Sequence, residues 1–254
     1  MIRSNYSRDG RMMERDNRRQ SLLAESVRAH ALMFETPLAP SYGNAAGIRM
    51  LVAFLVVGVV MFLALRFVAA AAGVRGSPAA NLGFVVALLA AFIVAQRAFV
   101  GLPMAAVGLR RFADWTLRQR LYLLEVVPLA AVVFAIVFAN HLLALLDKHG
   151  FAGFLLFSVF TGLLWGIVQE FLYRGWLQTE LTRRFGAIAG LLVANLAFTF
   201  GPLHLNYLLE PAGVRWGGLA AVFGIGLFFG IVYYRSGNLW IPAMLHGLWP
   251  PNMS

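Results

Sequence analysis

Long apolar runs alternate with short polar segments along most of the chain, after a polar and basic opening stretch. An α-helix needs about twenty residues to cross the hydrocarbon core of a membrane. Apolar runs of about this length lie at 49–73, 80–100, 121–146, 152–176, 186–206 and 217–234, with a shorter one at 238–250. The pattern predicts an all-α, polytopic transmembrane helical bundle with about seven spans, the last of them marginal.

The composition also favours a membrane protein. Hydrophobic residues make up 60% of the chain and charged residues 13%, and the mean hydropathy is +0.74, outside the usual range for a soluble domain of this length. The net charge of +10 does not indicate nucleic-acid binding, because the basic residues are dispersed between apolar runs. The chain contains no cysteine, which excludes disulfides, thiolate metal sites and a cysteine nucleophile.

The pattern divides the chain into three parts: a basic N-terminal segment at 1–48, three transmembrane helices within 49–150, and a helical core at 151–254. If the N-terminus is cytoplasmic, 17 basic residues face the cytoplasm and only four face the other side, namely Arg66, Arg75, Lys148 and Arg215. The positive-inside rule therefore predicts an integral membrane protein with a cytoplasmic N-terminus. Within the first segment, residues 21–34 fit an interfacial helix and a disordered tail with a short helical patch equally well.

Two charged residues, Glu170 and Arg174, stand one helical turn apart inside the fourth run. An ionisable residue inside a span is costly, so it usually faces a bundle interior or a wet cavity and marks a functional site. The alternative is that Arg174 extends to the cytoplasmic interface and Glu170 is its i,i+4 partner. For the pair alone the two interpretations are equally good, but His204 and His246 lie downstream in similarly apolar surroundings.

The two histidines can reach the depth of Glu170. If the fourth helix runs unbroken to the turn at 183–186, Glu170 lies about 21 Å before that turn and His204 about 27 Å after it. His246 lies about 12 Å from the next cytoplasmic turn, at 235–238. We expect the three side chains to meet below mid-membrane, in a cavity open to the cytoplasm. One buried His is more often a packed core residue than a catalyst, but three groups at compatible depth favour a site.

These residue types can perform hydrolysis. A carboxylate and an imidazole that face one water can remove its proton, and a second imidazole with an amide can hold the oxyanion that forms at a peptide carbonyl. A Glu and two His could instead bind zinc, but the chain has no His-Glu-x-x-His pair and no third strong ligand; a divalent metal is not required, and no cofactor is expected. Six other candidates are expected to be solvated, in the tail or near the interfaces, namely His30, His141, His149, Asp147, Glu180 and Glu210.

Three short motifs follow one another in the C-terminal part: Gln169-Glu170-x-x-x-Arg174, Phe200-x-x-x-His204, and the run from Tyr234 to Trp240 that leads into His246. They resemble the motifs of the CAAX-protease and bacteriocin-processing (CPBP) membrane family, which includes the Rce1-type CAAX prenyl endopeptidases and bacterial Abi proteins. The resemblance covers about residues 155–252. It implies a glutamic-type intramembrane endopeptidase fold, with a CPBP-like catalytic-type core at 151–254.

In that family's pattern, Glu-Glu-x-x-x-Arg, Phe-x-x-x-His and His-x-x-x-Asn, the first Glu and the first His activate water. The last His and the Asn stabilise the oxyanion, and the Arg is structural. By this resemblance His204 orients the water and His246 holds the oxyanion, while Gln169 stands where the first Glu is expected and Pro250 where the Asn is expected.

Two substitutes are available for the missing groups. Glu170 can supply the carboxylate if a rotation or local bulge compensates for its position about 100° around the helix from Gln169. Asn252 can supply the amide, because Pro250 and Pro251 end the helix and let the chain turn back. Pro242, within the last run, favours a broken helix that exposes carbonyls near the site.

We therefore predict an endopeptidase in the membrane bilayer, in the bacterial inner membrane, that hydrolyses a membrane-associated or lipidated peptide. The catalytic residues would be Glu170, His204 and His246, supported by Gln169, Arg174 and Asn252. The alternative is a non-catalytic pseudopeptidase that binds a peptide or membrane-protein partner on the same fold, which Gln169 and Pro250 favour.

Overall fold

The computed structural model describes residues 38, 40–73, 77–209 and 213–248, and all regular structure in this part of the chain is helical. The helices are α2 (Asn44–Ala53), α3 (Phe62–Ala71), α4 (Pro78–Val94), α5 (Leu117–Val137), α6 (Ala139–Phe154), α7 (Thr161–Glu170), α8 (Thr179–Phe185), α9 (Ala187–Phe200), α10 (Leu205–Leu208), α11 (Trp216–Ser236) and α12 (Trp240–Gly247). π-Helical stretches join or extend several of them, at Phe54–Met61, Ala95–Val100, Leu155–Phe160 and Phe171–Gln178. Single 3₁₀ turns lie at Met104–Val107, Phe112–Asp114 and Pro202–His204.

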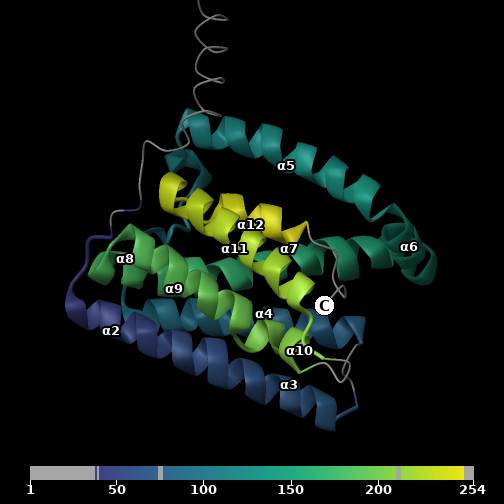
Figure 1. The fold of residues 1–254 in the computed structure, drawn as a ribbon, viewed down its shortest axis with the longest axis horizontal. Helices are drawn as coiled ribbons and strands as arrows, with labels where there is room; N and C mark the ends of the chain where they lie inside the picture. Colours follow the sequence, from purple (N-terminus) through teal and green to yellow (C-terminus); the bar gives the residue numbers. More distant parts are fainter. Residues whose placement is uncertain (1–37, 39, 74–76, 210–212, 249–254) are drawn as a thin grey trace, which may run out of the picture.

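Six helices among the described residues are long and apolar enough to cross a membrane: Asn44–Ala71, Pro78–Val100, Leu117–Val137, Ala139–Phe185, Ala187–His204 and Trp216–Ser236. Most of them run side by side as a bundle, while α5 lies across one side of it (Figure 1). The all-α, polytopic fold class predicted from the hydrophobic pattern is thus confirmed.

Two predicted spans are wrong. The run at 121–146 is broken, because Phe138 leaves the helical conformation with φ −107° and ψ 21°, so α5 ends at Val137 and α6 begins at Ala139. The apolar pattern continues across this break without a Gly or Pro to mark it. The seventh span, at 238–250, is the eight-residue helix α12, which at about 12 Å is too short to cross a membrane. Pro242 does not break it, since it lies in the first turn, where backbone N–H groups have no helical partner.

The fourth span begins at a kink. Gly150 has φ +65° and ψ 172° inside the segment assigned to α6, a left-handed φ that glycine adopts at little cost. The chain then continues as one long helical segment through α7, the π-helical stretch Phe171–Gln178 and α8 to Phe185. This segment is longer than the predicted run at 152–176.

One end of the bundle carries most of the positive charge, and we name it the basic end. It comprises the start of α2, the end of the π-helical stretch after α4, the segment that leads into α5, the α8–α9 turn and the α11–α12 turn (Figure 1). The opposite end comprises the end of α3, the start of α4, the α5–α6 turn and α10. The described basic residues of the basic end are Arg49, Arg97, Arg110, Arg111, Arg118, Arg120, Arg183, Arg184 and Arg235.

Glu180 was expected to be solvated, and this is wrong. Its side chain has 0% exposure, accepts hydrogen bonds of 2.8 Å from both Nε and Nη2 of Arg183, and also pairs with Arg184. It presses against Gly47 of α2, so a buried carboxylate joins α8 to the first transmembrane helix. Burial, together with the nearby Glu180, raises the pKa of the Tyr42 hydroxyl above its ordinary value.

Other polar side chains are also satisfied inside the bundle. Trp176 Nε1 donates to Gln96 Oε1 at 2.8 Å, and Gln96 Nε2 donates to the carbonyl of Leu102 at 3.0 Å. Buried polar groups are stable only with such partners. The network ties the end of the second span to the helix that carries Glu170. The predicted helix or tail at 21–34 lies outside the described residues, as do residues 1–37 and 39 of the segment 1–48 that holds it.

Candidate active site

The site is built where α12 lies directly against α7. Gly166 of α7 faces α12 so closely that a Cβ there would lie 2.3 Å from the Ala243 carbonyl oxygen and 2.6 Å from the Gly247 nitrogen. On the other helix, a Cβ on Gly247 would lie 2.7 Å from Leu163 Cα. Small residues permit this approach of two helix backbones. It brings His246, the neighbour of Gly247, to the helical turn of α7 that ends at Glu170.

Glu170 and His246 are in direct contact. His246 Nδ1 lies 2.7 Å from Glu170 Oε1, and the Glu170 side chain has 0% exposure. A carboxylate beside Nδ1 accepts the ring N–H, which leaves Nε2 as the acceptor nitrogen of the neutral imidazole. The ring of Phe229 on α11 stacks on that of His246, with centroids 5.0 Å apart. The tautomer and the ring plane of His246 are therefore both fixed.

Arg174 is buried beneath this pair. Its exposure is 1%, Nε lies 3.3 Å from Glu170 Oε2, and Nη2 donates to the Gly226 carbonyl at 2.7 Å. The guanidinium also lies over the Phe198 ring, 4.4 Å from its centroid. The interpretation that Arg174 extends to the interface is wrong, although Glu170 is indeed its i,i+4 partner. The guanidinium thus joins Glu170 on α7 to the backbone of α11 and the ring of Phe198.

His204 is held by α9, the helix that precedes it. Its Nδ1 lies 2.8 Å from the Phe198 carbonyl oxygen, and a carbonyl can only accept, so Nδ1 carries the proton and Nε2 is the acceptor nitrogen. Gly201 and Pro202 end α9 and turn the chain so that His204 closes a 3₁₀ turn. The Phe198 ring meets both imidazoles edge-on, with centroids 4.8 Å from His204 and 5.7 Å from His246.

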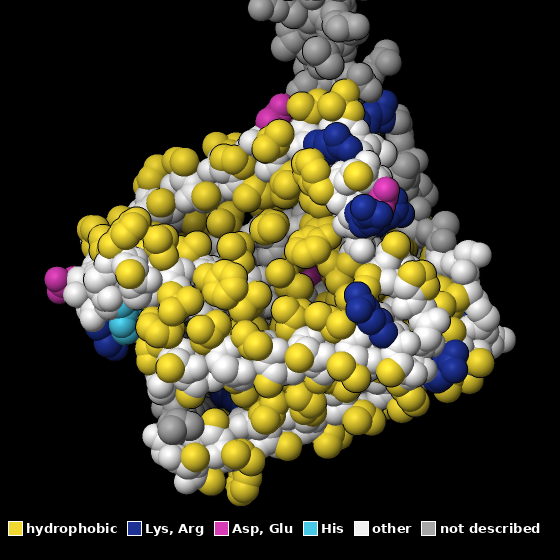
Figure 2. All heavy atoms as spheres, turned by 180° about the vertical axis from the view of Figure 1, so that it is seen from behind, with side chains coloured by type: hydrophobic (Ala, Val, Ile, Leu, Met, Phe, Trp, Pro, Cys, Tyr) yellow, Lys and Arg dark blue, Asp and Glu magenta, His cyan; other side chains and the backbone are white. Residues whose placement is uncertain are grey.

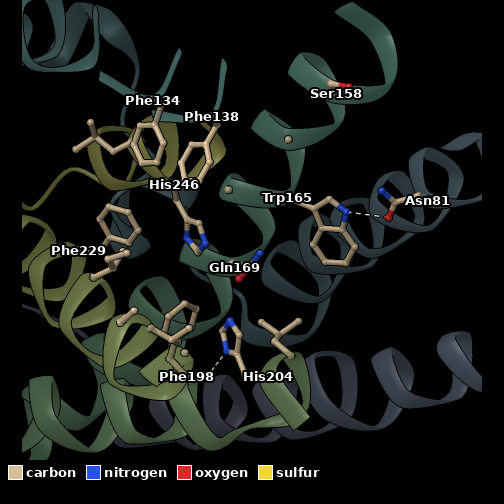
Figure 3. Close-up of a pocket in the computed structure, with 18 of the residues that line it drawn as sticks. Asn81, Phe134, Phe138, Ser158, Trp165, Gln169, Phe198, His204, Phe229 and His246 are labelled. Atoms are coloured by element: carbon tan, nitrogen blue, oxygen red, sulfur yellow. Dashed lines mark hydrogen bonds between the residues drawn. The ribbon is translucent and has the colours of Figure 1, made fainter. Parts of the chain in front are cut away.

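Both histidines and Gln169 line one cavity of about 940 Å³. In the view of Figure 3, the Gln169 side chain lies between the two rings. Glu170 is not among the lining residues, so its carboxylate reaches the cavity only through His246. Aromatic side chains form much of the remaining wall, among them Phe134, Phe138, Trp165 and Phe229 (Figure 3).

The cavity does not open at the basic end, as the sequence led us to expect. Besides α6, α7 with the stretch before it, and α12, its lining comes from α3, the start of α4, the middle and end of α5, and the segments 198–207 and 215–229, and it includes no described residue of the basic turns. Seen from behind, this part of the molecule is hollowed, with hydrophobic side chains around the hollow (Figure 2). His149, expected to be solvated, is one of the lining residues.

The helices that make this site fall within one segment that matches known proteins. Residues 149–250 match the family model described as type II CAAX prenyl endopeptidase Rce1-like. This segment resembles the Rce1-like family. No curated protein and no solved structure matches the chain. The match covers α7, α9, α11 and α12, which carry both histidines and Glu170, and it leaves the first three spans outside.

A π-helical stretch does lie beside Glu170, but it follows this residue and so is not the bulge that was proposed to turn Glu170 into the place of Gln169. The π-helical stretch begins at Phe171, directly after Glu170, and continues to Gln178, where it sets the rotation of Arg174 rather than that of Glu170. Gln169 therefore faces the cavity and Glu170 faces α12. Asn252 and Pro250 lie outside the described residues.

The described residues contain no group of three or more His, Cys, Asp or Glu side chains that could hold a metal ion. Two imidazoles and the Gln169 amide are the polar groups at the inner end of the cavity. Zinc sites normally have at least three protein ligands of these kinds, and Glu170, already bound to His246 and Arg174, does not line the cavity.

Sequence reasoning missed the aromatic residues that hold the two histidines of the site. Phe198 contacts both rings and Arg174, and Phe229 stacks on His246. Neither residue carries a signal in one sequence, because each is one phenylalanine among 21. The roles of Gly166 and Gly247 cannot be predicted from the sequence either, because they depend on which helices are in contact.

Proposed function

We propose that this protein is an intramembrane endopeptidase that hydrolyses a peptide bond in a membrane-associated polypeptide. The observation that carries the proposal is the 2.7 Å contact between His246 Nδ1 and the fully buried Glu170 carboxylate, at the wall of a cavity of about 940 Å³. The Rce1-like match over residues 149–250 supports the same class of activity.

In this proposal His246 is the general base. Its Nε2 accepts a proton from a water in the cavity, and Glu170 stabilises the imidazolium that forms, as a buried carboxylate does beside a catalytic histidine. Arg174 holds Glu170 in place through its contact with Oε2. Glu170 thus acts by orienting His246 and by stabilising its imidazolium form, and not by contact with the water.

His204 and Gln169 act on the same water and on the carbonyl it attacks. The acceptor Nε2 of His204 takes one hydrogen bond from the water and orients it. The Gln169 side chain carries two N–H donors, which can bind the oxyanion as the carbonyl carbon becomes tetrahedral. Glutamine supplies such donors and ionised glutamate does not, so the departure at position 169 suits this role.

The proton balance closes without another group. Water loses one proton to His246 and its oxygen forms the new bond to the carbonyl carbon. The C–N bond then breaks as protonated His246 returns the proton to the leaving amine. The products are a carboxylic acid and an amine, each at the end of one polypeptide fragment.

A second function is binding without hydrolysis. It is favoured by Gln169, which stands where the resemblance expects the carboxylate that activates water. A chain with this substitution can keep the fold and the cavity and hold a peptide or a membrane protein there.

The decisive experiment is mass spectrometry of protein termini in membranes from the native host. It compares the wild type, a deletion, and the variants His246→Ala, Glu170→Gln and His204→Ala, with His141→Ala as the control because His141 does not line the cavity. Termini that vanish in the deletion and in the first two variants, but persist in the control, are the expected result. Termini unchanged by the deletion, with a fall in one partner's abundance, would establish the binding protein instead.

Gln169→Glu separates the two roles of position 169. If Gln169 donates to the oxyanion, this variant loses the termini that depend on the protein. If the variant instead forms them faster than the wild type, the missing carboxylate is the limiting group and the proposed division of roles is wrong.

A further inference from the structure

The cavity leaves the histidines in one direction only along α7. It extends from Gln169 to Ser158, about 16 Å at 1.5 Å per residue, and both residues line it. Its outer part is lined by residues that belong to the turns opposite the basic end, namely Ala69, Pro78, Phe138 and His149. A polypeptide that reaches the histidines through this cavity therefore comes from that end.

The interior between the histidines and the basic end is filled with large side chains. Trp176 and Tyr233 have 0% exposure and Tyr173 has 1%. Leu239 and Ile241, at the start of α12, are also at 0%. Close-packed side chains leave no room for a polypeptide without local unfolding, so among the described residues no second route leads from the basic end to the site.

The charge distribution assigns the two ends to the two sides of a membrane. Nine described basic residues lie at the basic end, whereas Arg66, Lys148 and Arg215 are the described basic residues at or near the other. The same imbalance is visible on the face shown in Figure 2, where Lys and Arg gather mostly at one end. By the positive-inside rule the basic end is cytoplasmic, and the cavity faces the opposite leaflet.

The hollow is bordered by hydrophobic side chains (Figure 2), and the outer half of α5 exposes apolar residues, among them Val132 at 56% and Ile136 at 72%. In a membrane such a border contacts lipid tails. A water-soluble peptide would have to leave water to reach it, whereas a segment already anchored in the bilayer would not.

We infer that the substrate is a membrane-anchored polypeptide whose scissile bond enters the cavity from the extracytoplasmic leaflet. That this polypeptide is a substrate rests on the proposed function, whereas its route into the cavity does not depend on hydrolysis. The inference places the cleaved bond on the side of the membrane opposite the one expected from the depth of the turns in the sequence.

The route can be tested by cysteine labelling, because the chain has no cysteine of its own. Ala69→Cys and Ala80→Cys place a thiol on the outer part of the cavity wall. Ala113→Cys places an exposed thiol at the basic end and serves as the matched control. Each variant of the full chain is treated with a charged, membrane-impermeant maleimide, in right-side-out and in inside-out membrane vesicles.

The expected result is that both cavity cysteines react in right-side-out vesicles, whereas Ala113→Cys reacts only in inside-out vesicles. Three outcomes would overturn the inference: reaction of the cavity cysteines from the same side as Ala113→Cys, reaction of Ala113→Cys from the outside, or no reaction of the cavity cysteines from either side. None of these results depends on catalysis, so failure of the route and failure of the proposed function remain distinguishable.

If hydrolysis is established, the cleavage positions give a second test. Termini that depend on His246 should map to the extracytoplasmic half of a span or to the residues that adjoin it. Termini that map to cytoplasmic tails would contradict the inference even if the enzyme is active.

Discussion

Gly166→Ala is the substitution that most directly tests how the site is held together. The new Cβ would lie 2.3 Å from the Ala243 carbonyl oxygen, 2.6 Å from the Gly247 nitrogen and 2.9 Å from the Gly247 Cα, all of them backbone atoms of α12. Backbone atoms cannot move away by a change of rotamer, as side-chain atoms can, so α12 must move away from α7 by about 1 Å to restore ordinary contact distances.

This displacement falls on the contact that carries the proposed mechanism. His246 precedes Gly247 on α12, and Glu170 lies one turn beyond Gly166 on α7, so separation of the helices lengthens the 2.7 Å bond between His246 and Glu170. A hydrogen bond stretched past about 3.5 Å is no longer one. A misplacement of about 1 Å in an active site can cost about 100-fold in rate, and overpacking costs about 1–3 kcal/mol of stability.

The assay measures two quantities for the same purified protein: the rate at which a substrate found by the termini experiment is cleaved, and the midpoint of thermal unfolding in detergent. We expect the rate to fall about 100-fold while the variant still folds. Gly224→Ala is the matched control, since a Cβ there meets nothing within 4 Å and alanine is the better helix former. Wild-type rate and midpoint in Gly166→Ala would show that α7 and α12 are not in contact there.

Three further substitutions test the polar contacts around the site. Arg174→Lys keeps the charge but loses the planar group that reaches the Gly226 carbonyl. We expect the stability to fall by about 1–3 kcal/mol and cleavage to slow, both measured in the same two assays. An unchanged unfolding midpoint would contradict this. Gln96→Leu leaves the buried Trp176 N–H without its acceptor, so the free energy of unfolding should fall by about 1–3 kcal/mol. An unchanged free energy of unfolding would show that this hydrogen bond is absent. Glu180→Gln removes a buried carboxylate at the basic end. The midpoint of thermal unfolding should fall, while the cleavage rate, measured well below that midpoint, should stay at the wild-type value. A cleavage rate as low as that of Arg174→Lys would instead show that the basic end influences the site.

The hydrophobic pattern predicts the fold class well because a span must be apolar over a fixed length. It fails where a helix is broken inside an apolar run. Phe138 breaks the run at 121–146 without a Gly or Pro to mark the break, whereas Gly150, with its left-handed φ, lies in the predicted gap between the runs at 121–146 and 152–176. α12 begins only at Trp240 and ends at Gly247, so it is shorter than the apolar run at 238–250 in which it lies.

The candidate site was likewise predicted in part: the depth of its residues could be predicted, but their orientation could not. Depth along the helices can be counted from the turns, and the count placed Glu170, His204 and His246 at compatible depth, where the structure has them close together. Rotation cannot be counted, because it depends on which faces meet. The pairing of Glu170 with His246 follows from the close approach at Gly166, and no periodicity in one sequence indicates it. The same missing rotation hid the direction of the cavity.

The π-helical stretch from Phe171 to Gln178 has a consequence for how this protein can change over evolution. Each residue of an ordinary helix advances the chain by about 100°, so the loss or gain of one residue here, if no change of hydrogen-bond pattern absorbs it, would rotate everything beyond it relative to Gln169 and Glu170. Thr179, whose hydroxyl donates to the Arg174 carbonyl five residues earlier, would lose that partner. Variation in this stretch should therefore consist of replacements at constant length, with insertions and deletions confined to the turns on either side.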